Sequence, residues 1–144
     1  MCRGGMCAGW GAWLRERAVA RARTRRSGGR PIGELQAVQH MLADLDADVY
    51  AARAASLQAQ AELDVLGPFD VPLHRDAIHL VSLIALVNDE AFFRVADRAV
   101  QIHGASGLAR GGVEEKLFRV ARNLRIPAGT VEIQRNQIAR ALLR

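Results

Sequence analysis

Lysine is almost absent from this chain, and aromatic residues, cysteine and proline are scarce. Only Lys116 among the 20 basic residues is a lysine, and aromatic residues make up 5% of the 144 residues. The 2 cysteines, Cys2 and Cys7, give neither a disulfide framework nor metal-ligand spacing, so we expect a reducing compartment such as the cytoplasm. The longest apolar run, residues 78–87, is too short to span a membrane.

Hydrophobic residues account for 50% of the chain and charged residues for 24%, which is the composition of a folded globular protein. Good helix formers such as Ala, Leu and Arg are plentiful, and runs of β-branched residues are few. The net charge is +5, and the basic excess is concentrated in residues 15–30. Such a surface attracts the phosphates of nucleic acid, lipid or a nucleotide cofactor, although basic runs most often form a solvated face.

Apolar residues recur three and four positions apart along most of the chain, which is the spacing of amphipathic helices. In residues 35–62, for example, the apolar stripe consists of Leu35, Val38, Leu42, Leu45, Val49 and Ala52. The expected helices cover residues 6–25, 35–62, 73 or 76 to 102, 113 to 122 or 124, and a last segment to residue 143.

Glycine and proline mark the ends of these helices. Gly67, Pro68 and Pro72 end the second helix, Gly104 ends the third, and Thr130 is the expected N-cap of the last. No segment has the pattern of a strand. The sequence therefore predicts an all-α fold, an up-and-down four-helix bundle, as one domain over residues 1–144. Residues 1–30 would form the N-terminal helix and basic segment, and residues 31–144 the bundle core with its sequence motifs.

Three segments carry a family pattern. Residues 25–36 read Arg-Arg-Ser-Gly-Gly-Arg-Pro-Ile-Gly-Glu-Leu-Gln, residues 99–107 read Ala-Val-Gln-Ile-His-Gly-Ala-Ser-Gly, and residues 125–135 read Arg-Ile-Pro-Ala-Gly-Thr-Val-Glu-Ile-Gln-Arg. Together they resemble the C-terminal helical domain of the acyl-CoA dehydrogenases, flavin enzymes that desaturate acyl-CoA thioesters. The first segment departs from that family's Arg-x-x-Phe-Gly-x-Pro-Ile-x-Glu-x-Gln pattern at Gly28, where the family has Phe. The resemblance covers essentially the whole chain.

The resemblance implies a bundle that binds FAD partly across a subunit interface, in a homo-oligomer or with a companion dehydrogenase subunit. Arg25 would pair with the FAD pyrophosphate, because a guanidinium group suits phosphate oxygens, and Ser27 and Gln36 would lie nearby. The segment that approaches the adenine and ribose from the partner subunit would be Gln101, Ile102, His103, Gly104 and Ala105.

The same resemblance places a second set of residues at the flavin. Thr130 and Glu132 would lie at the start of the last helix, where a helix N-terminus offers free N–H groups to an anion. Gly129 would face the acyl thioester of an acyl-CoA substrate, whose binding also needs the other domains of the family.

Each of these residues also has a simpler interpretation. Arg25 may be read as one more solvated arginine, and Gln101 and His103 as polar residues at a helix end. Gly104 can serve only as a C-cap and Thr130 only as an N-cap. We expect no metal site, because His40, His74 and His79 lack ligand spacing and the cluster of Asp44, Asp46 and Asp48 suits a solvated or interface face.

The residue expected to remove a proton from the substrate is missing. In the family reaction a glutamate takes the α-proton while a β-hydride passes to the flavin. Ala128 stands where that glutamate is expected, and the alternative position used by some branches falls just before Met1. Glu132, one helical turn further on, belongs to the cofactor set. The chain therefore has no assigned catalytic residue, and the N-terminal helical domain and β-domain of the family have no counterpart in it.

Three interpretations of function follow from these observations. In the first, the chain is a truncated or split acyl-CoA dehydrogenase that is inactive without the remaining domains or a companion subunit. In the second, it is a non-catalytic helical module that self-associates or docks on intact relatives, and it forms a stable oligomer without flavin. In the third, it is a basic helical protein that binds nucleic acid in a salt-sensitive way. None of the three involves a membrane.

Overall fold

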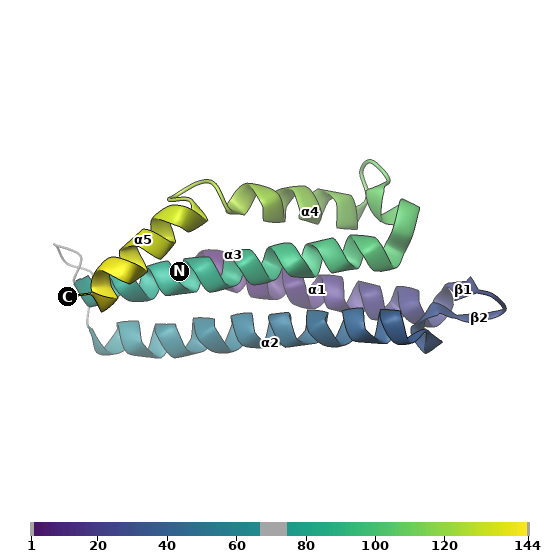
Figure 1. Cartoon of the computed structure of the whole chain (residues 1–144), viewed down its shortest axis with the longest axis horizontal. Coiled ribbons are helices and arrows are strands. Elements are labelled where there is room, and N and C mark those ends of the chain that lie inside the picture. Colours follow the sequence, from purple (N-terminus) through teal and green to yellow (C-terminus); the bar gives the residue numbers. More distant parts are fainter. Residues whose placement is uncertain (1, 67–74, 144) are drawn as a thin grey trace.

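The computed structural model describes residues 2–66 and 75–143, and the side chains of residues 2 and 3 lie outside that description. Almost all of the described chain is helical (Figure 1). The helices are α1 (Cys2–Thr24), α2 (Gln36–Val65), α3 (Arg75–His103), α4 (Val113–Leu124) and α5 (Val131–Leu142), with short 3₁₀ turns η1 (Ile32–Glu34) and η2 (Gly104–Leu108). The predicted helices are confirmed to within a few residues at most ends. The predicted break at residues 67–72 and His74 lie outside the described residues.

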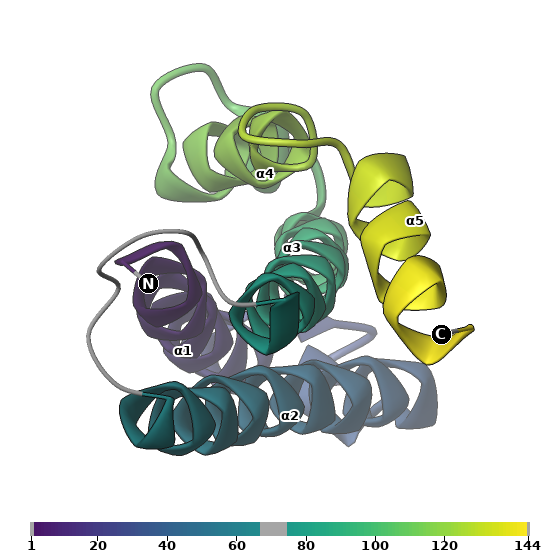
Figure 2. The ribbon, with the colours of Figure 1, turned by 90° about the vertical axis from the view of Figure 1, so that its left-hand side faces the viewer.

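The helices form the predicted bundle, with α3 at its centre. The long helices α1, α2 and α3 run up, down and up, and α4 and α5 follow one another back along α3 (Figure 1). Seen from its end, α3 is surrounded by the other helices (Figure 2), and it packs against each of them. In the described part of the chain, no helix combines the length and apolarity needed to cross a membrane.

The second half of α3 supplies the largest share of the apolar core. Phe92, Val95, Ala96 and Ala99 are at most 2% exposed, and they pack against residues of α1, α2 and α4. The first half of α3 is less covered, and Val81 is 39% exposed. The apolar side chains of this helix are therefore buried mainly towards its C-terminal end.

A short β-hairpin, which the sequence did not predict, connects α1 to η1. The strands β1 (Arg26–Ser27) and β2 (Arg30–Pro31) pair antiparallel, with Ser27 opposite Arg30. The connecting residues Gly28 and Gly29 have φ of 59° and 82°, as a tight two-residue hairpin turn requires. The expectation of no strand was wrong because the strands are too short to show alternation. Gly28 takes a backbone conformation that would strain the Phe of the family pattern.

Acidic residues of α2 form ion pairs with both neighbouring helices. Asp46 pairs with Arg15 of α1 at 2.8 Å, and Asp48 pairs with Arg94 and Arg98 of α3 at 2.6 and 2.7 Å. Burial raises the pKa of Asp48, but the hydrogen bonds and charges of the two α3 arginines outweigh this effect and hold the pKa below its ordinary value. The predicted Asp cluster is therefore an interhelical contact.

We expect Asp48→Asn to lower the free energy of unfolding by about 1–2 kcal/mol, because it leaves two arginines facing a neutral side chain at the α2–α3 contact. Urea denaturation measures this change. Asp46→Asn is the matched control, since the Asp46 side chain is 62% exposed. Its cost should be about 0.5 kcal/mol or less. Equal losses for the two variants would contradict the distinction between a half-buried and an exposed pair.

The ion pairs of Asp48 predict that the stability of the protein depends on pH. Because the pKa of Asp48 is lowered in the folded protein, its contribution is complete above the unfolded value of 3.8 and disappears as the pH falls through the folded value. Asp48→Asn should therefore lose less stability than the wild type on acidification below pH 3.8. Parallel stability curves for the two proteins in this range would show that Asp48 is not the titrating group.

Candidate functional site

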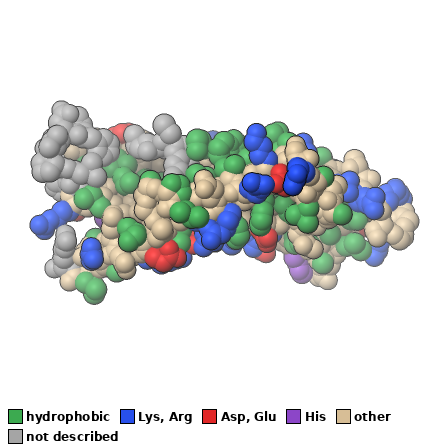
Figure 3. Space-filling model, turned by 90° about the horizontal axis from the view of Figure 1, so that it is seen from above, with side chains coloured by type: hydrophobic (Ala, Val, Ile, Leu, Met, Phe, Trp, Pro, Cys, Tyr) green, Lys and Arg blue, Asp and Glu red, His purple; other side chains and the backbone are tan. Residues whose placement is uncertain are grey.

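The hairpin end of the bundle presents a group of arginines without carboxylate partners. Among the described residues, no acidic side chain forms an ion pair with Arg23, Arg25, Arg26 or Arg30. In the view of Figure 3, Lys and Arg side chains but no Asp or Glu are visible at this end. Arg94, Arg98 and Arg125, by contrast, pair with carboxylates along the sides of the bundle. The hairpin end therefore carries positive charge that no ion pair within the described part of the molecule neutralises.

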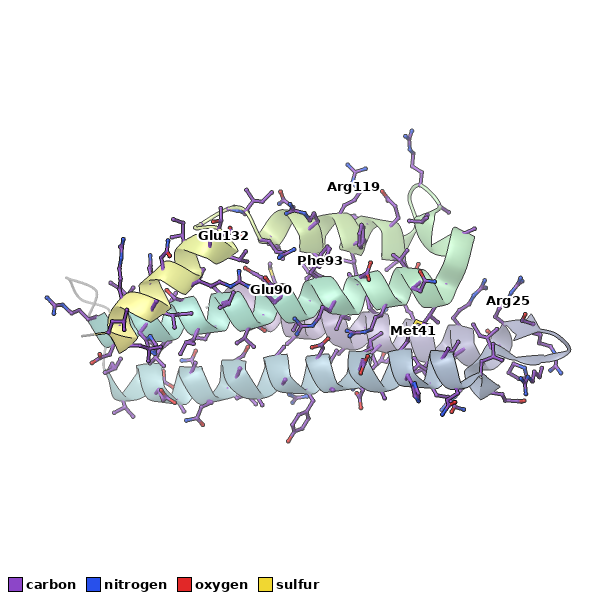
Figure 4. All side chains as sticks on the ribbon, viewed as in Figure 1. Arg25, Met41, Glu90, Phe93, Arg119 and Glu132 are labelled. Atoms are coloured by element: carbon purple, nitrogen blue, oxygen red, sulfur yellow. The ribbon has the colours of Figure 1, made fainter. Side chains whose placement is uncertain are left out.

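The predicted pyrophosphate set lies at this end. Arg25 follows the last residue of α1 and is exposed, and its side chain projects from the bundle (Figure 4). Ser27 is exposed on β1, and Gln36 is exposed as the first residue of α2. The turn between them is fixed by Gln39, which donates from Nε2 to the Gly33 carbonyl at 3.0 Å. These three polar side chains are therefore free to meet a ligand that approaches the end of the bundle.

The predicted adenine segment lies where α3 ends, at the same end of the bundle. Gln101 is exposed, whereas the side chain of Ile102 is 5% exposed in the core, so only its backbone could meet a ligand. Gly104 has φ of 64°, and a Cβ atom added there would meet nothing within 4 Å. The glycine thus ends the helix in a left-handed conformation and leaves open space beside the backbone.

A buried carboxylate that sequence reasoning missed lies beneath this segment. Oε1 of Glu114, in the first turn of α4, accepts a hydrogen bond from Nε of Arg17 and lies 3.2 Å from Nε2 of His103. The Glu114 side chain is 5% exposed. Burial raises its pKa, but the Arg17 hydrogen bond, a backbone N–H and the two nearby cations outweigh burial, so the pKa lies below its ordinary value. The sequence suggested only a favourable helix dipole for this residue.

Arg21 of α1 also contacts the end of α3. Its Nη2 donates to the carbonyl oxygen of His103 at 3.4 Å. Its Nε is buried and has no hydrogen-bond partner among the described residues. Arg21 lies one helical turn before Arg25, so it connects the end of α3 with the hairpin end of α1.

The turn between α4 and α5 contains Ala128, which stands where the family resemblance places a catalytic glutamate. Ala128 has φ of 57°, which is unusual for a residue with a side chain, and Gly129 has φ of 98°. Gln134, itself 6% exposed, donates from Nε2 to the carbonyl oxygens of both residues at 3.3 and 3.2 Å. The methyl group of Ala128 can neither accept nor donate a proton. Gln134 fixes the turn, and nothing in the sequence pattern marked it.

The start of α5 has the predicted cap. Thr130 Oγ1 accepts a hydrogen bond from the Ile133 N–H at 3.4 Å. Glu132 is exposed, and its own backbone N–H and the Thr130 side chain lower its pKa. A carboxylate with a lowered pKa is a weaker base, so the geometry does not favour Glu132 as a replacement for the missing glutamate.

The predicted cofactor residues therefore form two groups on one chain. The hairpin group consists of Arg25, Ser27, Gln36 and residues 101–105, and the α5 group consists of Gly129, Thr130 and Glu132. Figure 4 shows Arg25 and Glu132 in opposite halves of the bundle. The structure brings the members of each group together but does not bring the two groups together.

Comparison with known proteins shows the same domain in several flavin enzymes. Residues 1–143 match the family model of the acyl-CoA dehydrogenase C-terminal domain. A probable acyl-CoA dehydrogenase of Bacillus subtilis is 35% identical over 127 residues, which are 88% of this chain and 31% of that protein. A 3-sulfinopropanoyl-CoA desulfinase of Paraburkholderia xenovorans is 35% identical over 88% of this chain and 30% of its own length.

Solved structures give the same result for the fold. Butyryl-CoA dehydrogenase from Megasphaera elsdenii superposes with a TM-score of 0.86 at 25% identity, over 99% of this chain and 35% of that one. A probable acyl-CoA dehydrogenase from Mycobacterium abscessus also reaches 0.86 at 25% identity, over 97% of this chain and 35% of that one. The chain spans about a third of the length of these relatives.

We expect Ala128→Gly to raise the free energy of unfolding by about 0.5–1 kcal/mol, because glycine adopts a positive φ without strain. Ala109→Gly is the matched control, since Ala109 also lies in a turn but has φ of −62°. That variant should be destabilised by about 0.5 kcal/mol, because it only adds freedom to the unfolded chain. Urea denaturation compares the two. A loss of stability in Ala128→Gly would show that the alanine methyl group stabilises the fold by more than the backbone strain destabilises it.

Proposed function

Because the chain belongs to the acyl-CoA dehydrogenase family, as its C-terminal domain, we propose that it contributes the helical half of a FAD site in an acyl-CoA-transforming flavoenzyme. The reaction class would be α,β-desaturation of an acyl-CoA thioester. The printed names of relatives include butyryl-CoA and 3-sulfinopropanoyl-CoA enzymes, so a CoA thioester is the substrate class that they share.

The observation that carries the proposal is the unpaired guanidinium of Arg25 at the hairpin end. A pyrophosphate needs cations that no carboxylate already neutralises, and Arg25 has no acidic partner among the described residues. The open space beside Gly104 suits the approach of a flat ring. The residues present therefore fit the phosphate and adenine portions of FAD.

These positions suggest a role for each residue of the proposed site. Arg25 would hold the pyrophosphate, with Ser27 and Gln36 beside it, and Gln101 with the backbone of residues 102–105 would bound the adenine. Thr130 and Glu132 would border the flavin, which supplies a hydride acceptor when bound. The two groups lie in opposite halves of one chain, so they would meet different parts of the cofactor, and residues 101–105 would approach the adenine from the partner subunit.

The chain alone would not carry out desaturation. Removal of the α-proton requires a base within hydrogen-bonding reach of the substrate, and Ala128 offers none. Glu132 is held at the α5 N-terminus with a lowered pKa. The base would have to come from another domain or from a companion subunit. A non-catalytic oligomerisation module, which would use the domain for contact only, is the alternative function.

Flavin retention tests the proposal directly. The purified chain is mixed with FAD, freed of unbound cofactor, and examined by its visible absorbance. We expect bound flavin, and we expect Arg25→Ala and Gln101→Ala to weaken FAD binding about tenfold each, the loss of roughly one charge-assisted or polar hydrogen bond. Arg23→Ala is the matched control, because it removes an exposed arginine two residues away that belongs to neither group.

Three results would count against the proposal. Unchanged FAD affinity in Arg25→Ala and Gln101→Ala would show that the hairpin group does not contact the cofactor. A stable oligomer that retains no flavin would favour the contact module. Equal losses in Arg25→Ala and Arg23→Ala would indicate general attraction to the basic end rather than a defined pyrophosphate site.

A further inference from the structure

At the end of α3, the ring of His103 lies between two oxygen acceptors. Its Nδ1 is 2.8 Å from the carbonyl oxygen of Ala99, and its Nε2 is 3.2 Å from Oε1 of Glu114. A carbonyl oxygen and an ionised carboxylate only accept hydrogen bonds, so both ring nitrogens face acceptors. The side chain is 11% exposed, so bulk water does not replace either partner.

Glu114 is fixed from its other side by α1. Arg17 donates from Nε to the same Oε1, although the two residues are 97 positions apart in the sequence. The charged groups that face His103 are therefore Glu114 from α4 and Arg17 and Arg21 from α1. One buried carboxylate holds the end of α3 against two other helices, and its removal would leave Arg17 and His103 without their shared acceptor.

The turn that follows depends on the orientation of His103. The carbonyl oxygen of His103 accepts hydrogen bonds from Ser106 Oγ at 2.8 Å and from Arg21 Nη2 at 3.4 Å. Gly104, directly after it, reverses the chain with φ of 64°. His103 is thus anchored twice, through its ring by Ala99 and Glu114 and through its carbonyl oxygen by Ser106 and Arg21.

We propose that Glu114 is the positioning residue of the His103–Gly104 turn, and that it thereby sets the surface that the adenine end of FAD meets. The part that concerns FAD rests on the proposed function, whereas the part that concerns the turn stands on the geometry. Glu114 itself is buried beneath the turn and does not touch the ligand.

The variant Glu114→Gln keeps the shape of the side chain but removes its charge. Glu115→Gln is the matched control, because Glu115 is the next residue in the same helical turn and pairs with Arg119 of its own helix at 3.4 Å. His103→Gln assigns the ring signals and removes the ring. Circular dichroism establishes that each variant keeps its helices before further measurement.

The first measurement is nuclear magnetic resonance of the histidine ring N–H protons at neutral pH. We expect a slowly exchanging Nε2 proton for His103 in the wild type, because Nε2 lies 3.2 Å from Oε1 of Glu114, and faster exchange of this proton in Glu114→Gln. Backbone amides of residues 104–108 should exchange with solvent about tenfold faster in Glu114→Gln, the equivalent of one lost charge-assisted hydrogen bond. Glu115→Gln should match the wild type in both respects.

A double-variant cycle separates positioning through His103 from a general loss of packing. If Glu114 acts through the ring, Glu114→Gln adds little to the exchange of residues 104–108 once His103→Gln is present. Additive effects in the double variant would overturn the positioning role. So would fast exchange of the His103 Nε2 proton in the wild type, or wild-type exchange rates in Glu114→Gln.

The FAD measurement then tests the second part. We expect Glu114→Gln to bind FAD about tenfold more weakly, with Glu115→Gln unchanged. Unchanged affinity in Glu114→Gln, with a loosened turn, would overturn the connection to the cofactor. If no form of the chain binds FAD while the turn loosens as expected, the proposed function fails and the positioning of the turn by Glu114 is upheld.

Discussion

Burial of the second half of α3 is the constraint on which the rest of the molecule depends. Every other helix packs against α3, and the residues from Phe92 to Ile102 supply the largest share of the core. This burial fixes where α3 ends, and therefore where the His103–Gly104 turn lies relative to α1 and α4. The ion pairs along the sides adjust register between helices that are already held together by apolar contact.

Helix positions could be predicted because they depend on local spacing, whereas the site geometry depends on distant partners. The apolar stripe containing Leu45 and Val49 was visible in the sequence and is buried in the structure. The hairpin was not visible, since strands of two residues carry no periodicity. The burial of Glu114 was hidden for a different reason, because its partner Arg17 is 97 positions away. Gln134 escaped notice since its role is defined only by the carbonyls it reaches.

The family pattern located the proposed cofactor residues along the chain but did not predict how they lie in space. Arg25 and Glu132 lie in opposite halves of the bundle. Within the proposed function, this separation places the two groups at different parts of the cofactor, and Ala128 leaves the α4–α5 turn without a proton acceptor. The proposal therefore makes the domain one component of a shared site.

The almost complete use of arginine in place of lysine affects how the charge of the hairpin end depends on pH. A guanidinium group keeps its proton throughout the range of pH in which proteins fold, whereas carboxylates such as Asp48 and Glu114 lose their charge in acid. The positive charge that these arginines present to anions is therefore constant, whereas the ion pairs that hold the helices together titrate. Acid would weaken these ion pairs before it removed any charge from the arginines.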